Sequence, residues 1–139
     1  MQFEEQVVIA APVEKVFSLY ADVKGWSSWD PDVKTSSIAG EFVSGAVGTL
    51  QPSSGPKTKI AFTEVVTNRS FTVESKLPLC VMRFEHELSS HSGETKAVHR
   101  IAFEGLLSPL FGLLIGSQIK KGLPPYTLQG LKRAAEHQS

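Results

Sequence analysis

The sequence predicts an α+β fold in which a curved, seven-stranded antiparallel sheet wraps around a long C-terminal helix, with two short helices between strands 1 and 2. Three features of the chain support this prediction. A first apolar strand is followed by helical spacing of apolar residues, alternating apolar and polar residues fill positions 33–104, and a helical pattern runs from residue 106 to the end. A curved sheet cannot bury its concave face alone, so we expect the long helix to lie across it. The 139 residues offer room for one domain, 1–139.

The first strand and the two short helices follow from local spacing. Residues 3–9 form a strand pattern that ends before Pro12, a residue suited to the first turn of a helix. The next apolar residues recur at helical intervals, namely Val13, Val16, Phe17 and Tyr20. Gly25 ends this pattern, and Trp26 and Trp29, three positions apart, predict a second short helix.

The central part of the chain predicts an antiparallel meander, because segments of period two are separated by clusters of turn residues. The six strands are predicted at 33–40, 46–51, 57–67, 70–76, 79–90 and 94–104. The turn clusters contain Gly, Pro, Asn and Ser at short intervals, which is typical of an up-and-down sheet.

Composition and charge exclude several classes of protein. Basic and acidic residues number 14 each, so no net positive field attracts nucleic acid. One cysteine, Cys80, excludes both an internal disulfide framework and a Cys-rich zinc module. The first residues are acidic where a signal peptide is basic, and no apolar run reaches the ~18 residues of a membrane span. We therefore expect a cytoplasmic protein without a metal ion or a cofactor.

The last two strands can be aligned from their turn alone. If Ser92 and Gly93 occupy the centre of a hairpin, opposed residues lie symmetrically about them, and His86 faces His99. The same alignment places Met82, Phe84, Ile101 and Phe103 on the face of the two histidines. The imidazoles of opposed residues are close enough to share a proton, bridge a water or bind a polar head group. Three roles remain open for the pair: a structural hydrogen bond, orientation of a ligand, and general acid–base catalysis.

The turn at Asn68-Arg69 allows a similar alignment of the two strands around it. A two-residue turn there pairs Phe62 with Ser75 and Glu64 with Val73, so that Glu64 faces inward together with Phe62. A carboxylate on an apolar face needs a partner or a proton. Glu64 is therefore the second candidate polar group, with a structural bond at the sheet edge as the alternative role.

The C-terminal helix carries more leucine than one buried face requires. Phe111, Ile115 and Ile119 form a core stripe opposite Lys120 and Lys121. A second apolar stripe lies on the lysine side and consists of Leu106, Leu110 and Leu113. Contact with the loops at 40–56, a homodimer interface and transient docking to a membrane are the three explanations of this stripe.

Several motifs resemble the START-like superfamily, and more narrowly the bacterial polyketide cyclase/dehydrase group, also called SRPBCC. They are Ala-Pro-Val-Glu-Lys-Val-Phe after the first strand, Gly-Trp-Ser-Ser-Trp-Asp-Pro-Asp-Val after the first helix, Phe-Thr-Glu-Val-Val within the sheet, and Leu-Phe-Gly-Leu-Leu-Ile-Gly in the last helix. The resemblance implies a helix-grip fold with a deep apolar pocket for lipids, polyketides or other hydrophobic molecules. Pro124-Pro125 departs from the family, whose last helix is usually unbroken.

We therefore predict a carrier or sensor that binds a lipid, a polyketide or an isoprenoid-like molecule between the sheet and the long helix. The predicted ligand-binding residues are Trp29, Phe62, Phe71, Val73, Met82, Phe84, His86, His99, Ile101, Phe103, Phe111 and Ile115. A polyketide cyclase, aromatase or dehydratase that uses His86, His99 and Glu64 is the enzymatic alternative. A protein-interaction or membrane-docking module, acting through the second leucine stripe, is the third.

Overall fold

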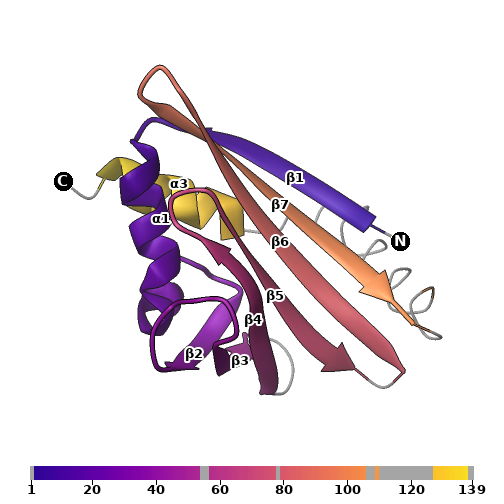
Figure 1. Ribbon diagram of the computed structural model, residues 1–139. Helices are drawn as coiled ribbons and strands as arrows, with labels where there is room; N and C mark the ends of the chain where they lie inside the picture. The colour runs from indigo at the N-terminus through magenta and orange to yellow at the C-terminus, as the bar shows by residue number, and fades with distance from the viewer. Residues whose placement is uncertain (1, 54–56, 78, 106–108, 110–126, 138–139) are drawn as a thin grey trace.

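The computed structural model describes residues 2–53, 57–77, 79–105, 109 and 127–137, and contains the predicted seven-stranded antiparallel sheet (Figure 1). The strands are β1 (Gln2–Ile9), β2 (Val33–Ala39), β3 (Val47–Pro52), β4 (Thr58–Val66), β5 (Ser70–Leu77), β6 (Cys80–His91) and β7 (Glu94–Glu104). Their order in the sheet is β1-β7-β6-β5-β4-β3-β2, so the first strand closes the sheet beside the last. The predicted strand ranges are confirmed to within two residues.

Three helices are described: α1 (Val13–Ala21), η1 (Val23–Ser28) and α3 (Thr127–His137). Helix α1 buries Val16, Phe17 and Tyr20, as the spacing predicts, and Pro12 stands just before its first turn. The second predicted helix is a short 3-10 helix rather than an α-helix. Six residues that include Gly25 favour the tighter helix, because 3-10 geometry is common in short connecting segments.

The predicted alignment of β6 and β7 is confirmed. His86 lies opposite His99, Met82 opposite Phe103, and Phe84 opposite Ile101. The left-handed conformations of Ser92 (φ 51°) and Gly93 (φ 85°) form the two-residue turn that sets this register.

The predicted alignment of β4 and β5 is wrong by one residue. The turn contains three residues, with Asn68 left-handed at φ 61°, and it pairs Val65 with Phe71 and Glu64 with Thr72. Because side chains alternate along a strand, the shift by one residue turns Glu64 to the outer, exposed face. A β-bulge after Phe62 then restores the inward direction of that side chain, which is fully buried.

The core lies between the concave face of the sheet and the helices. An aromatic cluster fills it near α1 and η1, with ring centroids 4.8–6.4 Å apart, and consists of Phe17, Tyr20, Trp26, Trp29, Phe42, Phe62 and Phe71. Offset and edge-to-face aromatic contacts of this kind stabilise a core beyond the area they bury.

Hydrogen bonds join helix α3 to two parts of the N-terminal segment, the turn before β2 and the end of β1. The Thr127 hydroxyl contacts Asp30 Oδ1 at 2.9 Å and Asp32 Oδ2 at 3.1 Å, at the turn that precedes β2. At the other end Lys132 Nζ donates to the carbonyl of Val8, and Glu136 accepts from the backbone N–H of Ala10. Figure 1 shows α3 beside α1 on the concave side of the strands.

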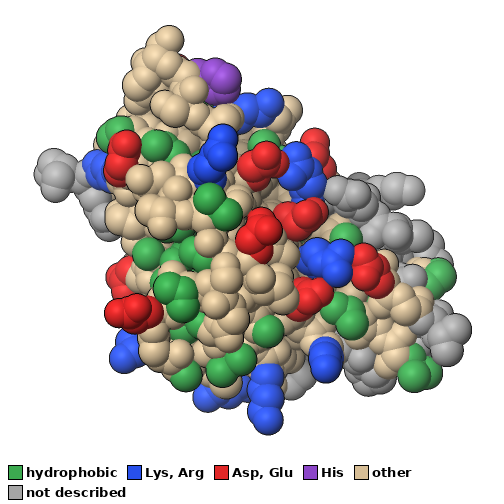
Figure 2. Space-filling model, in the orientation of Figure 1, with side chains coloured by type: hydrophobic (Ala, Val, Ile, Leu, Met, Phe, Trp, Pro, Cys, Tyr) green, Lys and Arg blue, Asp and Glu red, His purple; other side chains and the backbone are tan. Residues whose placement is uncertain are grey.

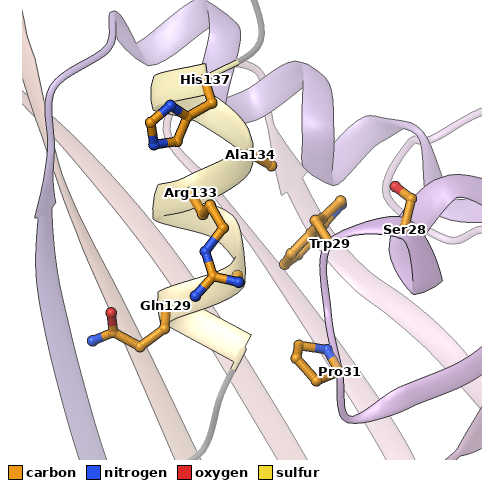
Figure 3. Close-up of a pocket in the computed structure, with 8 residues that line it drawn as sticks. Ser28, Trp29, Pro31, Gln129, Arg133, Ala134 and His137 are labelled. Atoms are coloured by element: carbon orange, nitrogen blue, oxygen red, sulfur yellow. The ribbon is translucent and has the colours of Figure 1, made fainter.

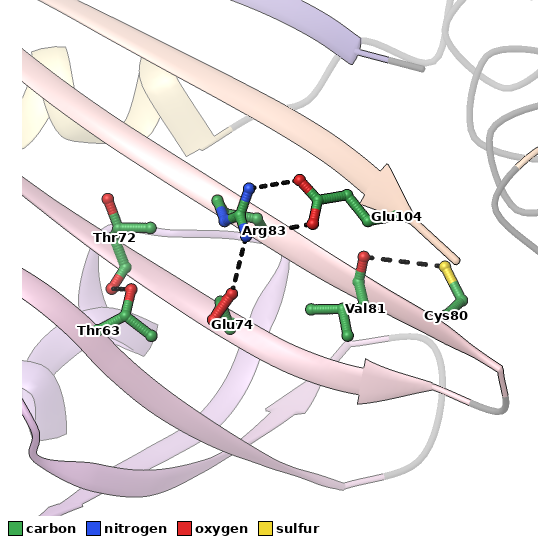
Figure 4. A network of polar contacts seen from close by, with 7 residues as sticks. All are labelled: Thr63, Thr72, Glu74, Cys80, Val81, Arg83 and Glu104. Atoms are coloured by element: carbon green, nitrogen blue, oxygen red, sulfur yellow. Dashed lines mark hydrogen bonds and ion pairs between the residues drawn. The ribbon is translucent and has the colours of Figure 1, made fainter.

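The outer face of the sheet is polar and carries two ion-pair groups. Arg83 bridges Glu74 and Glu104 across three strands (Figure 4). Arg100 similarly bridges Glu4 and Glu87. Figure 2 shows acidic and basic side chains intermingled over this region. Exposed pairs contribute only about 0–1 kcal/mol each, so this face is a solvated surface rather than a site.

Several predictions fall on residues outside the described part of the chain. These are the leucine stripe of Leu106, Leu110 and Leu113, the helix residues Phe111 and Ile115, and the interruption at Pro124-Pro125. Among the described residues, no helix has the length and apolar composition to cross a membrane.

Candidate functional site

Two histidines and a glutamate form a polar row across the apolar concave face. Pairing of adjacent strands places Glu5 on β1 opposite His99 on β7, and His99 opposite His86 on β6. The row continues through Phe71 on β5, which lies opposite His86. Directly opposed residues of antiparallel strands point to the same side of a sheet, so these four side chains share the inner face.

His86 is held in one orientation by Phe71. The two rings are stacked, with centroids 3.8 Å apart and planes 5° from parallel. His86 Nδ1 also lies 3.1 Å from the carbonyl oxygen of Phe71. A carbonyl oxygen carries no hydrogen, so Nδ1 donates and holds the proton of the ring. The neutral imidazole therefore has its lone pair on Nε2.

Tyr20 adds a third polar group, from helix α1. Its hydroxyl lies 2.7 Å from His99 Nε2, and the side chain is fully buried. The His86 and His99 rings meet edge to face with centroids 4.6 Å apart. The three polar groups thus converge at one place on a surface that is otherwise aromatic and aliphatic.

Burial keeps this cluster neutral near physiological pH. It lowers the pKa of His86 to about 4, against a small opposing effect of the hydrogen bond to Phe71. Burial, together with repulsion from a charged His86, holds the pKa of His99 well below its usual range. Burial raises the pKa of Tyr20, and it also raises the pKa of Glu5. His86, His99 and Tyr20 therefore stay uncharged near physiological pH.

Sequence reasoning missed Tyr20 and Glu5 as members of the site. The helical spacing predicts Tyr20 only as part of the apolar face of its helix, although a buried tyrosine hydroxyl usually needs a partner. Glu5 is the polar residue within an inward-facing set of β1, and the pairing of β1 with β7 was needed to place it beside His99.

The predicted wall residues lie on the inner face around the histidines. Phe62, Phe71, Val73 and Phe103 are buried there, whereas Met82, Phe84 and Ile101 are half-buried. Ser75 shares this face opposite Met82, and its buried hydroxyl has no hydrogen-bond partner among the described residues. Glu64 does not belong to this set, because it is exposed on the outer face.

Trp29 lines a different pocket from the predicted one. A pocket of about 290 Å³ lies between the η1–β2 connection and α3, and Figure 3 shows Trp29 facing α3 across it. Its lining consists of Ser28, Trp29, Pro31, Gln129, Gly130, Arg133, Ala134 and His137. Most of these side chains are exposed, so the pocket opens at the surface. Trp29 also approaches Tyr20, with ring centroids 6.3 Å apart, and so separates this pocket from the polar cluster.

No group of three or more potential metal ligands comes together within the part of the chain that the structure describes. The polar row contains two imidazoles and one carboxylate, and the described hydrogen bonds of the imidazoles go to Phe71 and Tyr20.

A seven-stranded antiparallel sheet with an apolar concave face and a C-terminal helix defines a helix-grip protein. The chain belongs to the family described as polyketide cyclase/dehydrase and lipid transport, whose model matches residues 1–137. No curated protein sequence matches the chain.

Solved structures share the fold at low sequence identity. A protein of Thermus thermophilus is 14% identical with a TM-score of 0.72, and 97% of each chain is covered. The Zhui aromatase/cyclase of Streptomyces is 18% identical with a TM-score of 0.71, over 98% of this chain and 93% of that one. The Aha1 dimer of Colwellia psychrerythraea is 16% identical with a TM-score of 0.70, over 99% and 97%. Likeness at this identity establishes the fold alone.

Proposed function

We propose that the protein binds an apolar small molecule between the concave face of the sheet and its C-terminal helix, as a carrier or sensor. The observation that carries the proposal is the convergence of Tyr20, His86 and His99 on an otherwise apolar face. Binding sites for small molecules are mostly apolar with a few well-placed polar groups, which orient the ligand. A lipid, polyketide or isoprenoid-like molecule fits this description, and the family of the chain supports it.

The low pKa of the histidines favours binding over catalysis. General acid–base catalysis is most efficient when the pKa of the group lies near the working pH. The pKa of His86 lies at about 4, so its neutral form is a weak base and its charged form is rare at neutral pH. The same cluster is well suited to neutral hydrogen bonds, because none of its members needs to gain or lose a proton.

Retention of a ligand tests this proposal. Native mass spectrometry of the purified protein is expected to show a lipophilic adduct, or an apolar dye to bind with one-to-one stoichiometry. Ile101→Phe places a larger, planar side chain on the inner face and is expected to weaken binding, whereas Ala102→Phe places the same side chain on the outer face and is the matched control. Circular dichroism establishes that both variants fold. A wild-type protein that carries no adduct and binds no dye contradicts the proposal.

A cyclase or dehydratase is the second candidate, and the 2.7 Å contact between Tyr20 and His99 favours it. In such a reaction one group removes a proton from carbon while another protonates the departing hydroxyl, so that water leaves. The test is loss of water from a phenyl-substituted β-hydroxyketone, which yields an absorbing enone. Acceleration that His99→Ala abolishes supports the enzyme, and Glu64→Gln serves as the outer-face control. Equal rates with and without the protein count against it.

A further inference from the structure

We propose that His86 Nε2 accepts a hydrogen bond from a hydroxyl group of the ligand, so that the site selects apolar molecules with an O–H donor over ethers or carboxylates of similar shape. This inference rests on the proposed function and names the chemistry that the site recognises.

The contact with Phe71 determines which ring nitrogen of His86 donates a hydrogen bond and which accepts one. The carbonyl at 3.1 Å can only accept, so Nδ1 is the protonated nitrogen and Nε2 the acceptor. Stacking on the Phe71 ring, with centroids 3.8 Å apart, fixes the plane of the imidazole, and a half-turn of the ring would lose the hydrogen bond of Nδ1 to the carbonyl. The backbone of β5 therefore determines which hydrogen-bonding group His86 offers.

Within the described part of the chain, His86 is the member of the cluster whose unpaired ring nitrogen is fixed as an acceptor. Among the described residues, Nε2 of His86 has no hydrogen-bond partner, whereas Nε2 of His99 is engaged by the Tyr20 hydroxyl. The bond between Tyr20 and His99 can run in either direction, so it sets no requirement for the ligand. An acceptor that has no partner among the described residues is available to a ligand, and a hydroxyl group of the ligand would form one hydrogen bond with it.

Ethers and carboxylates are poorer partners for the same chemical reason. An ether oxygen and a carboxylate oxygen carry no hydrogen, so each would place a lone pair against the lone pair of Nε2. A carboxylate would gain an ion pair if His86 were charged, but burial keeps the ring neutral.

The tautomer of His86 provides a test that needs no ligand. Long-range ¹⁵N–¹H correlation spectra of the labelled wild-type protein distinguish a protonated ring nitrogen from one with a lone pair. We expect the lone pair of His86 on Nε2 at neutral pH. A proton on Nε2 overturns the inference and leaves the proposed function intact.

Three naphthalene derivatives of similar shape test the selectivity: β-naphthol, its methyl ether and naphthalene-β-carboxylate. Equilibrium dialysis at neutral pH is expected to give about 3- to 10-fold tighter binding of the naphthol than of the ether, the range for one hydrogen bond, with the carboxylate weakest.

His86→Asn retains a donor near Nδ1 but lacks Nε2, so the preference for the naphthol over the ether is expected to disappear. His91→Asn makes the same change at an exposed position of β6 and is expected to retain the preference. Equal binding of the naphthol and the ether to the wild type overturns the inference alone. Binding of none of the three contradicts the proposed function, and the inference falls with it.

Discussion

Acidification is predicted to destabilise the protein through His86. The pKa of this histidine is about 4 in the folded protein and 6.5 as the ordinary value of the unfolded chain. Between these values the unfolded chain binds a proton that the folded protein does not. The stabilising contribution is therefore fully present above about pH 6.5 and is lost as the pH falls towards 4.

The magnitude follows from the two pKa values. At about pH 5 His86 is almost fully protonated in the unfolded chain and mostly neutral in the folded protein. This difference lowers the free energy of unfolding by at most about 2 kcal/mol relative to pH 7. His99 acts in the same direction, because its pKa is also lowered by burial. Asp30 acts in the opposite direction, since its pKa is raised to about 6. The pH dependence of wild-type stability therefore contains contributions from all three groups.

The His86→Asn variant isolates the contribution of His86. Urea unfolding at about pH 7 and pH 5 gives the free energy of unfolding of wild type and variant under both conditions. The loss of stacking on Phe71 is independent of pH and cancels in the comparison. We expect the advantage of the wild type to shrink by about 2 kcal/mol at the lower pH. An advantage that is the same at both pH values refutes the conclusion that burial suppresses ionisation of His86.

Three further perturbations test other contacts of the fold. Tyr20→Phe is expected to lower the free energy of unfolding by about 1–2 kcal/mol, because His99 Nε2 loses the hydroxyl at 2.7 Å; an unchanged urea midpoint contradicts this. Asp30→Asn removes a buried carboxyl whose pKa of about 6 lies above the ordinary value of 3.8. Above that pH the wild type carries a buried charge that the variant lacks, so the wild type is then least stable relative to the variant. The stability of the variant relative to wild type is expected to rise by at most about 3 kcal/mol between pH 4 and pH 7, and a constant difference counts against the raised pKa. Gly130→Ala would place a Cβ in steric conflict with the carbonyl oxygen of Trp29. It is expected to cost more than about 2 kcal/mol and to change tryptophan fluorescence, and wild-type values of both would show that α3 does not approach that carbonyl as described.

The sheet and the histidine pair could be predicted because they depend on local signals. Alternation of apolar and polar residues marks each strand, and turn residues mark each connection. A two-residue turn at Ser92 and Gly93 then determines which residues of β6 and β7 are opposed, including His86 and His99.

The same method failed at the neighbouring hairpin because the length of its turn was not evident. Asn68 adopts a left-handed conformation within a three-residue turn, which asparagine tolerates better than most residues. One additional residue moves Glu64 from the inner to the outer face. Turn length, rather than the composition of the strands, decided whether a carboxylate belonged to the candidate site.

By itself, the sequence determined the strands, the order of strands and helices along the chain, and the opposed histidines, because each depends on residues close together along the chain. Only the tertiary structure decided the remaining chemistry of the site. Tyr20 reaches His99 from 79 positions away, and Glu5 meets the same histidine through the pairing of the first and last strands. Such contacts depend on which distant surfaces are buried together, and the burial that creates them also keeps the histidines neutral.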